Sequence, residues 1–192
     1  MLAPPIETPR LILKPLDVAA ARGPYQSWMR DADLLRYMEV RHDPPDAARL
    51  ACYIGNMNAS NSELLLGIFP RHQADAHIGN IKLGPIAKYH RSAYIGILIG
   101  DRASWNQGFA TEAIRALTGY AFAELAMRRV KAGCYMDNAS SLRAFAKAGF
   151  REIARIPQER LCDGVWQDEI VLAMDEQAAA GANTAAKVSF KA

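Results

Sequence analysis

The chain has 192 residues, of which 51% are hydrophobic and 22% are charged, a composition typical of one globular domain with a sizeable core. Its 23 basic and 20 acidic residues give a formal net charge of only +3 and are spread along the whole sequence, which argues against nucleic acid as a partner. The first residues lack a signal-peptide core, and no stretch approaches the ~20 apolar residues that span a bilayer, so we expect a cytoplasmic protein without a membrane partner.

The three cysteines, Cys52, Cys134 and Cys162, lie far apart and follow no metal-ligand spacing. An odd number of separated cysteines fits a reducing compartment better than a disulfide framework. We therefore expect three free thiols, buried as small apolar side chains, and no metal site.

The first part of the chain predicts one strand and two helical segments. Residues 10–16, RLILKPL, follow a proline and are rich in branched side chains, which indicates a strand. A helical pattern over residues 18–38 is interrupted at Gly23-Pro24. A second helix is expected after Pro44-Pro45, because proline is tolerated in a first helical turn. The apolar face of that second helix consists of Leu50, Ile54 and Met57.

Three strand-like runs follow, over residues 63–69, 76–86 and 92–100, and they are separated by proline, glycine and charged turns. Consecutive strands joined by short turns predict an antiparallel meander. His77 and His90 flank these strands without a ligand cluster around them, so we interpret them as surface or hydrogen-bonded core histidines.

After Gly108 the apolar spacing changes to a helical repeat, which predicts a helix in front of a strand over residues 129–136. A connecting helix of this length predicts parallel pairing between that strand and residues 92–100. The apolar stripe of the helix consists of Ala110, Ala113, Ile114, Leu117, Ala121 and Leu125.

The end of the domain predicts a further helix and a hairpin. Asp137 or Asn138 is suited to cap a helix that ends at Gly149. Two closing strands, residues 150–156 and 165–175, are expected to pair through a turn near Asp163-Gly164. The side chains that the helix is expected to bury are Leu142, Phe145 and Ala146.

These elements predict a single domain over residues 1–176, of the α+β class, with a mixed sheet. Residues 177–192 are rich in alanine and lack periodicity, so we expect them to form a flexible tail.

The turn over residues 106–111 has the chemistry of an anion site. It lies where a strand ends and a helix begins, so amides without a helical partner point outward together with the positive end of the helix dipole. Gly108 and Ala110 let a bulky polyanion approach the backbone, and Thr111 adds a hydroxyl donor. A diphosphate fits this chemistry, and a tightly packed helix start without a ligand is the alternative.

The turn and the segments that follow it resemble the GNAT superfamily of acyl-CoA-dependent N-acetyltransferases. The pyrophosphate-binding turn of that family has the form Arg/Gln-x-x-Gly-x-Gly/Ala, and here Gly108, Phe109 and Ala110 match its end. Trp105 stands in the Arg/Gln position, where a tryptophan is common in the branch that includes acetylators of ribosomal-protein amino termini.

A second signature of the family, Asn-x-x-Ser followed by Gly-Phe, is met by Asn138, Ser141 and Gly149-Phe150. Residues 10–16 resemble the first strand of the same branch, so the likeness covers roughly residues 8–174. The resemblance implies a GNAT-like fold of three layers, with a central mixed sheet of about six or seven strands flanked by helices.

The resemblance also implies acetyl-CoA as the cosubstrate. In this family strand 94–100 splays away from strand 129–136, and the pantetheine arm pairs with the open edge as a surrogate strand. Candidates for the 3′-phosphate are Arg102, Arg143 and Lys147. The other implied cofactor-binding residues are Ile97, Leu98, Ile99, Gln107, Gly108, Phe109, Ala110, Thr111 and Asn138.

Acetyl transfer from a thioester needs a neutral amine, a donor for the oxyanion and a mild acid for the departing thiolate. A backbone amide near Ile99 is the candidate donor. Ser141, one turn into the helix after Asn138, is the candidate acid, and a hydroxyl bonded back to the helix backbone is the alternative. Many relatives carry a tyrosine acid where this sequence has Phe145. Glu39 lies between the helices that usually shape the acceptor pocket, and Asp168 interrupts an apolar strand face; each is a candidate base, with a water relay as the alternative.

For the acceptor, residues 37–45 and 77–86 resemble members of the family that acetylate an amino-sugar nucleotide, and the amino terminus of a protein is the alternative. A polyamine is disfavoured, because the sequence contains no acidic patch. The alternative to an enzyme is a non-catalytic acyl-CoA sensor, which would keep the cofactor motifs and lack the acid and the base. The expected oligomeric state is a monomer or a homodimer.

Overall fold

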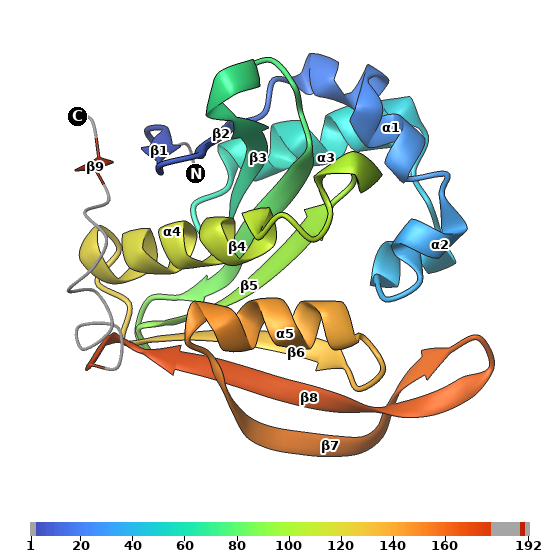
Figure 1. The fold of residues 1–192 in the computed structure, drawn as a ribbon, viewed down its shortest axis with the longest axis vertical. Coiled ribbons are helices and arrows are strands. Elements are labelled where there is room, and N and C mark those ends of the chain that lie inside the picture. The colour runs from blue at the N-terminus through green and yellow to red at the C-terminus, as the bar shows by residue number, and fades with distance from the viewer. Residues whose placement is uncertain (1–2, 178–188, 191–192) are drawn as a thin grey trace.

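The computed structural model describes residues 3–177 and 189–190 (Figure 1). The strands are β1 (Ile6–Glu7), β2 (Leu11–Pro15), β3 (Leu64–Pro70), β4 (Gly79–Ala87), β5 (Ser92–Ile99), β6 (Arg129–Tyr135), β7 (Arg151–Cys162), β8 (Val165–Asp175) and β9 (Ser189–Phe190). The α-helices are α1 (Pro24–Trp28), α2 (Ala32–Leu35), α3 (Ala47–Ala59), α4 (Phe109–Ala123) and α5 (Ala139–Ala148). Short 3-10 helices are η1 (Val18–Arg22), η2 (Glu39–His42), η3 (Arg71–Gln73) and η4 (Arg102–Ser104).

The strands form one mixed sheet in the order β7-β8-β6-β5-β4-β3-β2-β1-β9. The predicted meander of β3, β4 and β5 is confirmed, and β5 and β6 are parallel as the connecting helix predicts. The described sheet has nine strands where six or seven were expected, because β1 and β9 add two-residue strands at one edge. Strands this short carry no periodicity that a sequence pattern could reveal.

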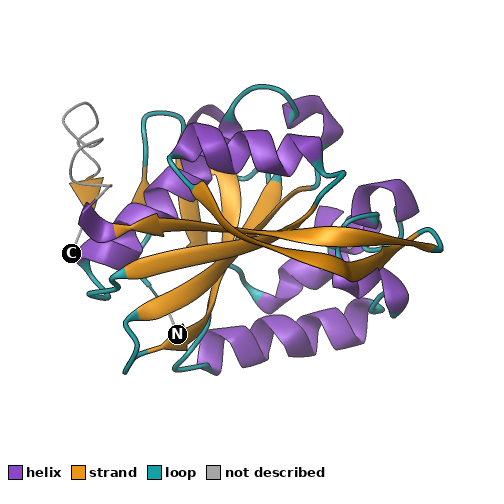
Figure 2. Ribbon diagram, turned by 90° about the horizontal axis from the view of Figure 1, so that it is seen from below, coloured by secondary structure: helices purple, strands orange, loops and turns teal. Residues whose placement is uncertain are grey.

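Helices cover both faces of the sheet, so the predicted three layers are confirmed (Figure 2). Helices α4 and α5 bury Ile114, Leu117 and Phe145 in one core cluster with the sheet. Helices α1 and α3 bury Trp28 and Ile54 in a second cluster on the opposite face. Each fully buried side chain of this size contributes roughly 1.5–3 kcal/mol, so both faces of the sheet are held by apolar packing.

The segment between β2 and β3 is more fragmented than the sequence pattern predicts. Three short helices, η1, α1 and α2, replace the one interrupted helix expected over residues 18–38, and η2 follows them. Asp17 and Asp31 each accept a hydrogen bond from a backbone amide at the start of one of these helices. The longer helix α3 is capped by Asp46, and its predicted apolar face is buried. Capped short helices turn the chain repeatedly over the sheet, and this layer forms a wall beside the open end of β5.

Two burial predictions are wrong. Ala146 is exposed, because the buried face of α5 passes through Phe145 and Ala148, which lie one helical turn apart. Cys52 is also exposed, on the solvent side of α3, whereas Cys134 and Cys162 are buried as expected; all three thiols are free.

Strands β7 and β8 form the predicted hairpin, with Asp163 and Gly164 at positive φ in its turn. The tip of the hairpin extends past the sheet toward α2 (Figure 1). Ser189 and Phe190 of the expected tail pair with β1 as β9, and the rest of that tail, residues 178–188 and 191–192, lies outside the described residues. In the described part of the chain, no helix has both the length and the apolar character that crossing a membrane requires.

Candidate active site

The parallel strands β5 and β6 separate soon after they meet. Their ladder pairs only Ser92, Ala93 and Tyr94 with residues 129–131, and the strands diverge beyond it. On its other side β5 bonds to β4, where the amide of Gly100 donates to the carbonyl of Ile78 at 2.9 Å. Because ladder bonds alternate along an antiparallel strand, the backbone groups of Ile97 and Ile99 point into the gap.

A cleft of about 700 Å³ follows this gap and is lined by residues from both layers of helices. On the side of α4 and α5 its wall includes Gly108–Thr111 and Asn138. On the side of α1 to α3 it includes Tyr25, Glu39 and Tyr53. The cleft therefore connects the two faces of the sheet through the opening between β5 and β6.

The turn before α4 has the geometry of an anion site. Gly108, the N-cap of α4, has φ 80°, a left-handed conformation that glycine adopts without strain. The first helical bond runs from the amide of Glu112 to the carbonyl of Gly108 at 3.1 Å. The amides of residues 109–111 precede that bond and have no helical carbonyl to reach, and these residues line the cleft.

Arg10 on the segment before β2 holds this turn in place, a contact that no sequence motif indicated. Its Nη1 donates to the carbonyl of Gln107 at 2.9 Å, and its Nε donates to Glu112 at 2.6 Å. The guanidinium also lies 4.9 Å from the centroid of the Phe109 ring. Thr8 adds a hydroxyl bond to Glu112 at 2.6 Å, so two segments about 100 residues apart in sequence fix the turn.

Eight of the nine predicted cofactor-binding residues line the cleft, and Gln107 is the exception. The side chain of Gln107 instead donates from Nε2 to the carbonyl of Ala103 at 2.7 Å, because the residue folds back over η4 before the helix begins. Trp105 lines the cleft, and its indole N–H donates to the carbonyl of Ile99 at 2.8 Å. Trp105 thus pairs one of the backbone groups at the open edge of β5.

The three predicted phosphate-binding cations separate into two groups. Arg143 and Lys147 on α5 line the cleft. Arg102 does not line it; its guanidinium pairs with Asp31 at 2.8 Å. Two of the three cations therefore line the same cleft as residues 108–111.

Ser141 lies in the first turn of α5 and lines the cleft, where its Oγ is 3.4 Å from the Sγ of Cys134. Asn138 caps this turn by accepting a hydrogen bond from the amide of Ser141 at 3.2 Å. Burial raises the pKa of the Cys134 thiol, so this neighbour stays protonated. Phe145 is buried against Phe150, with ring centroids 5.1 Å apart, and carries no acidic proton.

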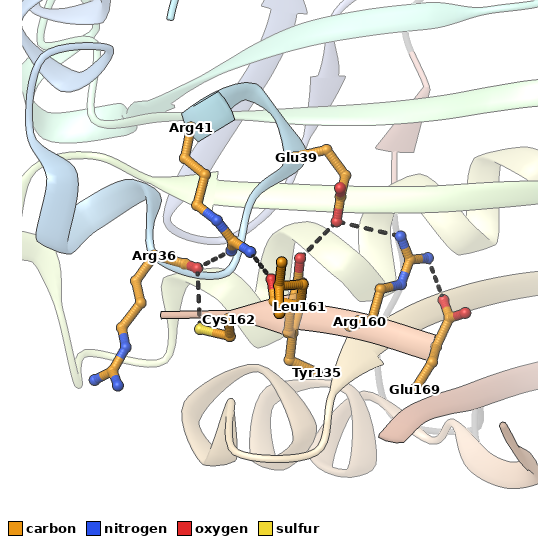
Figure 3. Close-up of polar contacts among 8 residues, drawn as sticks. All are labelled: Arg36, Glu39, Arg41, Tyr135, Arg160, Leu161, Cys162 and Glu169. Carbon is orange, nitrogen blue, oxygen red and sulfur yellow. Dashed lines mark hydrogen bonds and ion pairs between the residues drawn. The ribbon is translucent and has the colours of Figure 1, made fainter. Parts of the chain in front are cut away.

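Glu39 lies in a chain of polar contacts across the opposite side of the cleft (Figure 3). Its Oε1 accepts from the hydroxyl of Tyr135 at 2.6 Å and from Nη1 of Arg160 at 3.2 Å. Arg160 also donates from Nη2 to Glu169 at 2.6 Å. Burial, together with the Glu39 carboxylate, raises the pKa of Tyr135, so its hydroxyl remains a donor.

A second set of contacts in Figure 3 ties η2 to the β7–β8 hairpin. Arg41 donates to the carbonyls of Arg36 and Leu161, and the thiol of Cys162 lies 3.6 Å from the carbonyl of Arg36. Glu39 is therefore held over the cleft by the hairpin, although η2 itself is only one turn long.

Asp168, the other predicted base, does not line the cleft. Its Oδ1 accepts from the amide of Gln158 at 3.1 Å, in the irregular part of the hairpin. Successive side chains of a strand point to opposite faces, so it is the next residue, Glu169, that joins the network with Glu39. Sequence reasoning missed Glu169, which is only 8% exposed, because the burial of a strand carboxylate depends on the elements packed over it.

The part of the cleft beneath α1 to α3, which we call the acceptor half, has Asn80 and Lys82 of β4 and Gly96 and Leu98 of β5 in its lining. A Cβ atom at Gly96 would meet nothing within 4 Å, so the floor is open there. The Lys82 ammonium pairs with Glu63 at 2.7 Å.

Known proteins resemble this chain in sequence and in fold. A family model described as acetyltransferase (GNAT) domain matches residues 10–151. The probable N-acetyltransferase YjcK of Bacillus subtilis is 36% identical over 122 residues, which cover 61% of this chain and 66%, about two thirds, of that protein.

Two solved structures share the fold. An acetyltransferase (GNAT family) from Bacillus anthracis superposes with a TM-score of 0.78 at 20% identity, over 90% of this chain and 99% of that one. Spermidine N-acetyltransferase from Vibrio cholerae, in complex with CoA and spermine, superposes with a TM-score of 0.79 at 20% identity, over 88% of this chain and 98% of that one.

Proposed function

Because the chain belongs to the acetyltransferase (GNAT) family, we propose that it transfers the acetyl group of acetyl-CoA directly to a primary amine bound in the acceptor half of the cleft. The observation that carries this proposal is the gap between β5 and β6. It joins an anion-binding helix start on one face of the sheet to a polar pocket on the other face. Both substrates can therefore meet at the open edge of β5.

The cleft supplies a complementary group for each part of acetyl-CoA. The amides of residues 109–111 suit the diphosphate, and the cations of Arg143 and Lys147 suit the 3′-phosphate. The backbone of Ile97 and Ile99 suits the amides of the pantetheine arm, with Asn138 as a side-chain partner. The amide of Ile99 is the proposed donor to the oxyanion.

The reaction then needs proton transfers at the amine and at the thiolate. The neutral acceptor nitrogen attacks the thioester carbonyl. The carbon–sulfur bond then breaks, so that the thiolate leaves and the acetyl group stays bonded to the nitrogen. Before the attack Glu39 takes one proton from the ammonium form of the acceptor, because an alkyl ammonium has a pKa near ~10.4 and is charged at neutral pH. After the attack the nitrogen loses its second proton; Ser141, which lines the cleft, gives its own proton to the departing thiolate and takes this second proton back through water.

An amino-sugar nucleotide is the first candidate acceptor, and the amino terminus of a protein is the second. Ion pairs compensate much of the charge in the acceptor half: Glu39 pairs with Arg160 at 3.2 Å, and Lys82 pairs with Glu63. A polyamine dication would gain little attraction from such a pocket, which disfavours that class.

The decisive experiment measures free thiol released from acetyl-CoA in the presence of a panel of amines. Thiol release that requires both an amine and the protein supports transfer. A protein that binds acetyl-CoA in calorimetry but releases no thiol with any amino sugar, peptide or polyamine is a sensor, and the proposal then fails.

Replacing Ser141 tests the acid. Ser141→Ala is expected to lower kcat about 100-fold, the size of a general-acid contribution, while the Kd of acetyl-CoA stays within about twofold. Ser141→Cys keeps a dissociable proton at the same place and is expected to recover part of the rate. An unchanged kcat in Ser141→Ala removes the residue from the mechanism.

Filling the open floor tests the acceptor half. Gly96→Val is expected to raise the KM of the amine at least tenfold, because the new side chain enters space that the acceptor needs, and to leave the Kd of acetyl-CoA unchanged. Gly119→Val is the matched control: a Cβ there also meets nothing within 4 Å, but Gly119 lies on α4 outside the cleft lining. Equal KM values in both variants would contradict the assignment.

A further inference from the structure

Asn80 is a buried amide with an unused donor. The residue is only 5% exposed and belongs to the lining of the acceptor half. Its Nδ2 is one of three buried side-chain polar atoms that have no hydrogen-bond partner among the residues that the structure describes. Leaving a buried donor unsatisfied destabilises a fold, so a group of this kind calls for a partner from outside the chain.

His77 fixes which end of the amide is left over. Its Nε2 lies 2.8 Å from Oδ1 of Asn80 and donates to it, since a carbonyl oxygen can only accept. The His77 ring stacks on Phe69 at 5.1 Å and meets Trp28 edge-on at 4.9 Å. Burial lowers the pKa of His77 and so favours the neutral ring, although the bond to Asn80 acts in the opposite direction. The packed His77 ring thus donates to Oδ1 of Asn80, which leaves Nδ2 of Asn80 as the free donor toward the cleft.

The sheet places this donor one strand away from the gap. Asn80 on β4 pairs with Leu98 on β5, and side chains of paired residues share a face. Leu98 packs in the core cluster beneath α1 and α3, so Asn80 lies on the acceptor face. Neighbouring strands are ~4.8 Å apart, and Gly96 has no side chain to block the space between. A small group attached close to the reacting amine can therefore span this distance.

We propose that Asn80 determines acceptor specificity: its Nδ2 donates to an oxygen carried on the carbon next to the amine-bearing carbon. This inference rests on the proposed function. A hydroxyl of an amino sugar and the first carbonyl of a peptide both present such an oxygen, whereas a polyamine has none. His77 acts through Asn80 as a positioning residue.

The hydroxyl of Tyr53, which also lines the cleft, is consistent with the same chemistry. Burial raises the pKa of Tyr53, so the group stays a neutral hydroxyl. The acceptor half therefore offers neutral donors where an oxygen is expected.

The test compares amines that carry an oxygen on the carbon next to the amine-bearing carbon with amines that lack it. Glucosamine is paired with cyclohexylamine, alaninamide with sec-butylamine, and spermidine serves as the oxygen-free polyamine. Asn80→Asp keeps the shape and the oxygen that faces His77 but removes the donor, and Asn80→Ala removes it without adding charge. In both variants the KM of glucosamine or alaninamide is expected to rise about tenfold to a hundredfold, as loss of such a bond implies. The KM of the oxygen-free partner is expected to stay within about twofold.

His77→Phe provides a second readout that a folding defect at Asn80 cannot explain. It keeps an aromatic ring against Phe69 and Trp28 but removes the donor to Oδ1, so the amide can rotate. We expect part of the preference for the oxygen-bearing amine to be lost, with an unchanged thermal unfolding midpoint and an unchanged Kd for acetyl-CoA.

The outcomes separate this inference from the proposed function. Wild-type protein that acetylates both members of each pair with equal KM, or variants that raise both KM values equally, overturn the role of Asn80 and leave the acetyltransferase proposal standing. Wild-type protein that releases no thiol with any of the five amines, nor with amino-sugar nucleotides and peptides, overturns both. Whichever pair shows the larger effect identifies the source of the oxygen as a sugar or a peptide.

Discussion

An Ala110→Glu variant is expected to lose about 100-fold or more in acetyl-CoA affinity while it keeps its fold. Ala110 lies in the first turn of α4 and lines the cleft beside the amides assigned to the diphosphate. Two unit charges ~4 Å apart repel by about 4 kcal/mol at an effective dielectric constant of ~20. A carboxylate in the first turn of a helix is itself favourable, so the helix should not suffer. Titration calorimetry with acetyl-CoA measures the loss directly.

Ala110→Gln is the matched control for this experiment. Glutamine has the shape of glutamate without its charge, so it reports only the effect of bulk. We expect it to weaken binding far less than glutamate does, and added salt to narrow the difference, because salt screens the repulsion. Equal affinities for the two variants, or a glutamate variant that binds like wild type, would contradict the phosphate assignment.

A Glu39→Gln variant is expected to lower kcat/KM about 100-fold near pH 7, the size of a general-base contribution. The amide introduced by this substitution retains an oxygen that can accept from Tyr135 and Arg160, so the contacts across the cleft can survive. Without a base the amine must lose its proton to bulk water before it binds productively. The rate of the variant should therefore recover as the pH rises toward the amine pKa of ~10.4.

The shape of the pH profile separates a base from a structural support. If Glu39 only holds the wall of the cleft, the variant is slower by the same factor at every pH. Asp168→Asn serves as the comparison, because Asp168 is bonded to Gln158 outside the cleft lining, and its kcat/KM is expected to stay within about twofold of wild type. A large loss in Asp168→Asn with none in Glu39→Gln would exchange their roles.

The half of the site assigned to acetyl-CoA could be predicted from the sequence because its geometry is local. Gly108 and the residues after it form one turn and one helix start, and Asn138 caps the next helix three residues before Ser141. Their spacing along the chain is also their spacing in space. Even here, Arg10 fixes the turn from about 100 residues away in the sequence, and no local pattern predicted this contact.

Strand pairing and side-chain parity decided the acceptor half. Glu39 meets Tyr135 across 96 positions of sequence, and Arg160 across 121. The sequence analysis named Asp168 as a candidate base, but the residue that joins the network of Glu39 and Arg160 is Glu169. A shift of one residue along a strand moves the side chain to the opposite face of the sheet. The position of Asn80 in the acceptor half likewise depends on strand pairing, because Asn80 pairs with Leu98 of β5.

The sequence by itself determined the class of fold, the order of the longer strands and helices, and the position of the turn assigned to the diphosphate, because periodicity and helix capping are properties of neighbouring residues. Only the tertiary structure decided which polar groups share the cleft and which of them lack a partner. Hydrogen-bond satisfaction depends on every element packed around a group, so the free amide of Asn80 became visible only once the sheet and the helices above it were assembled.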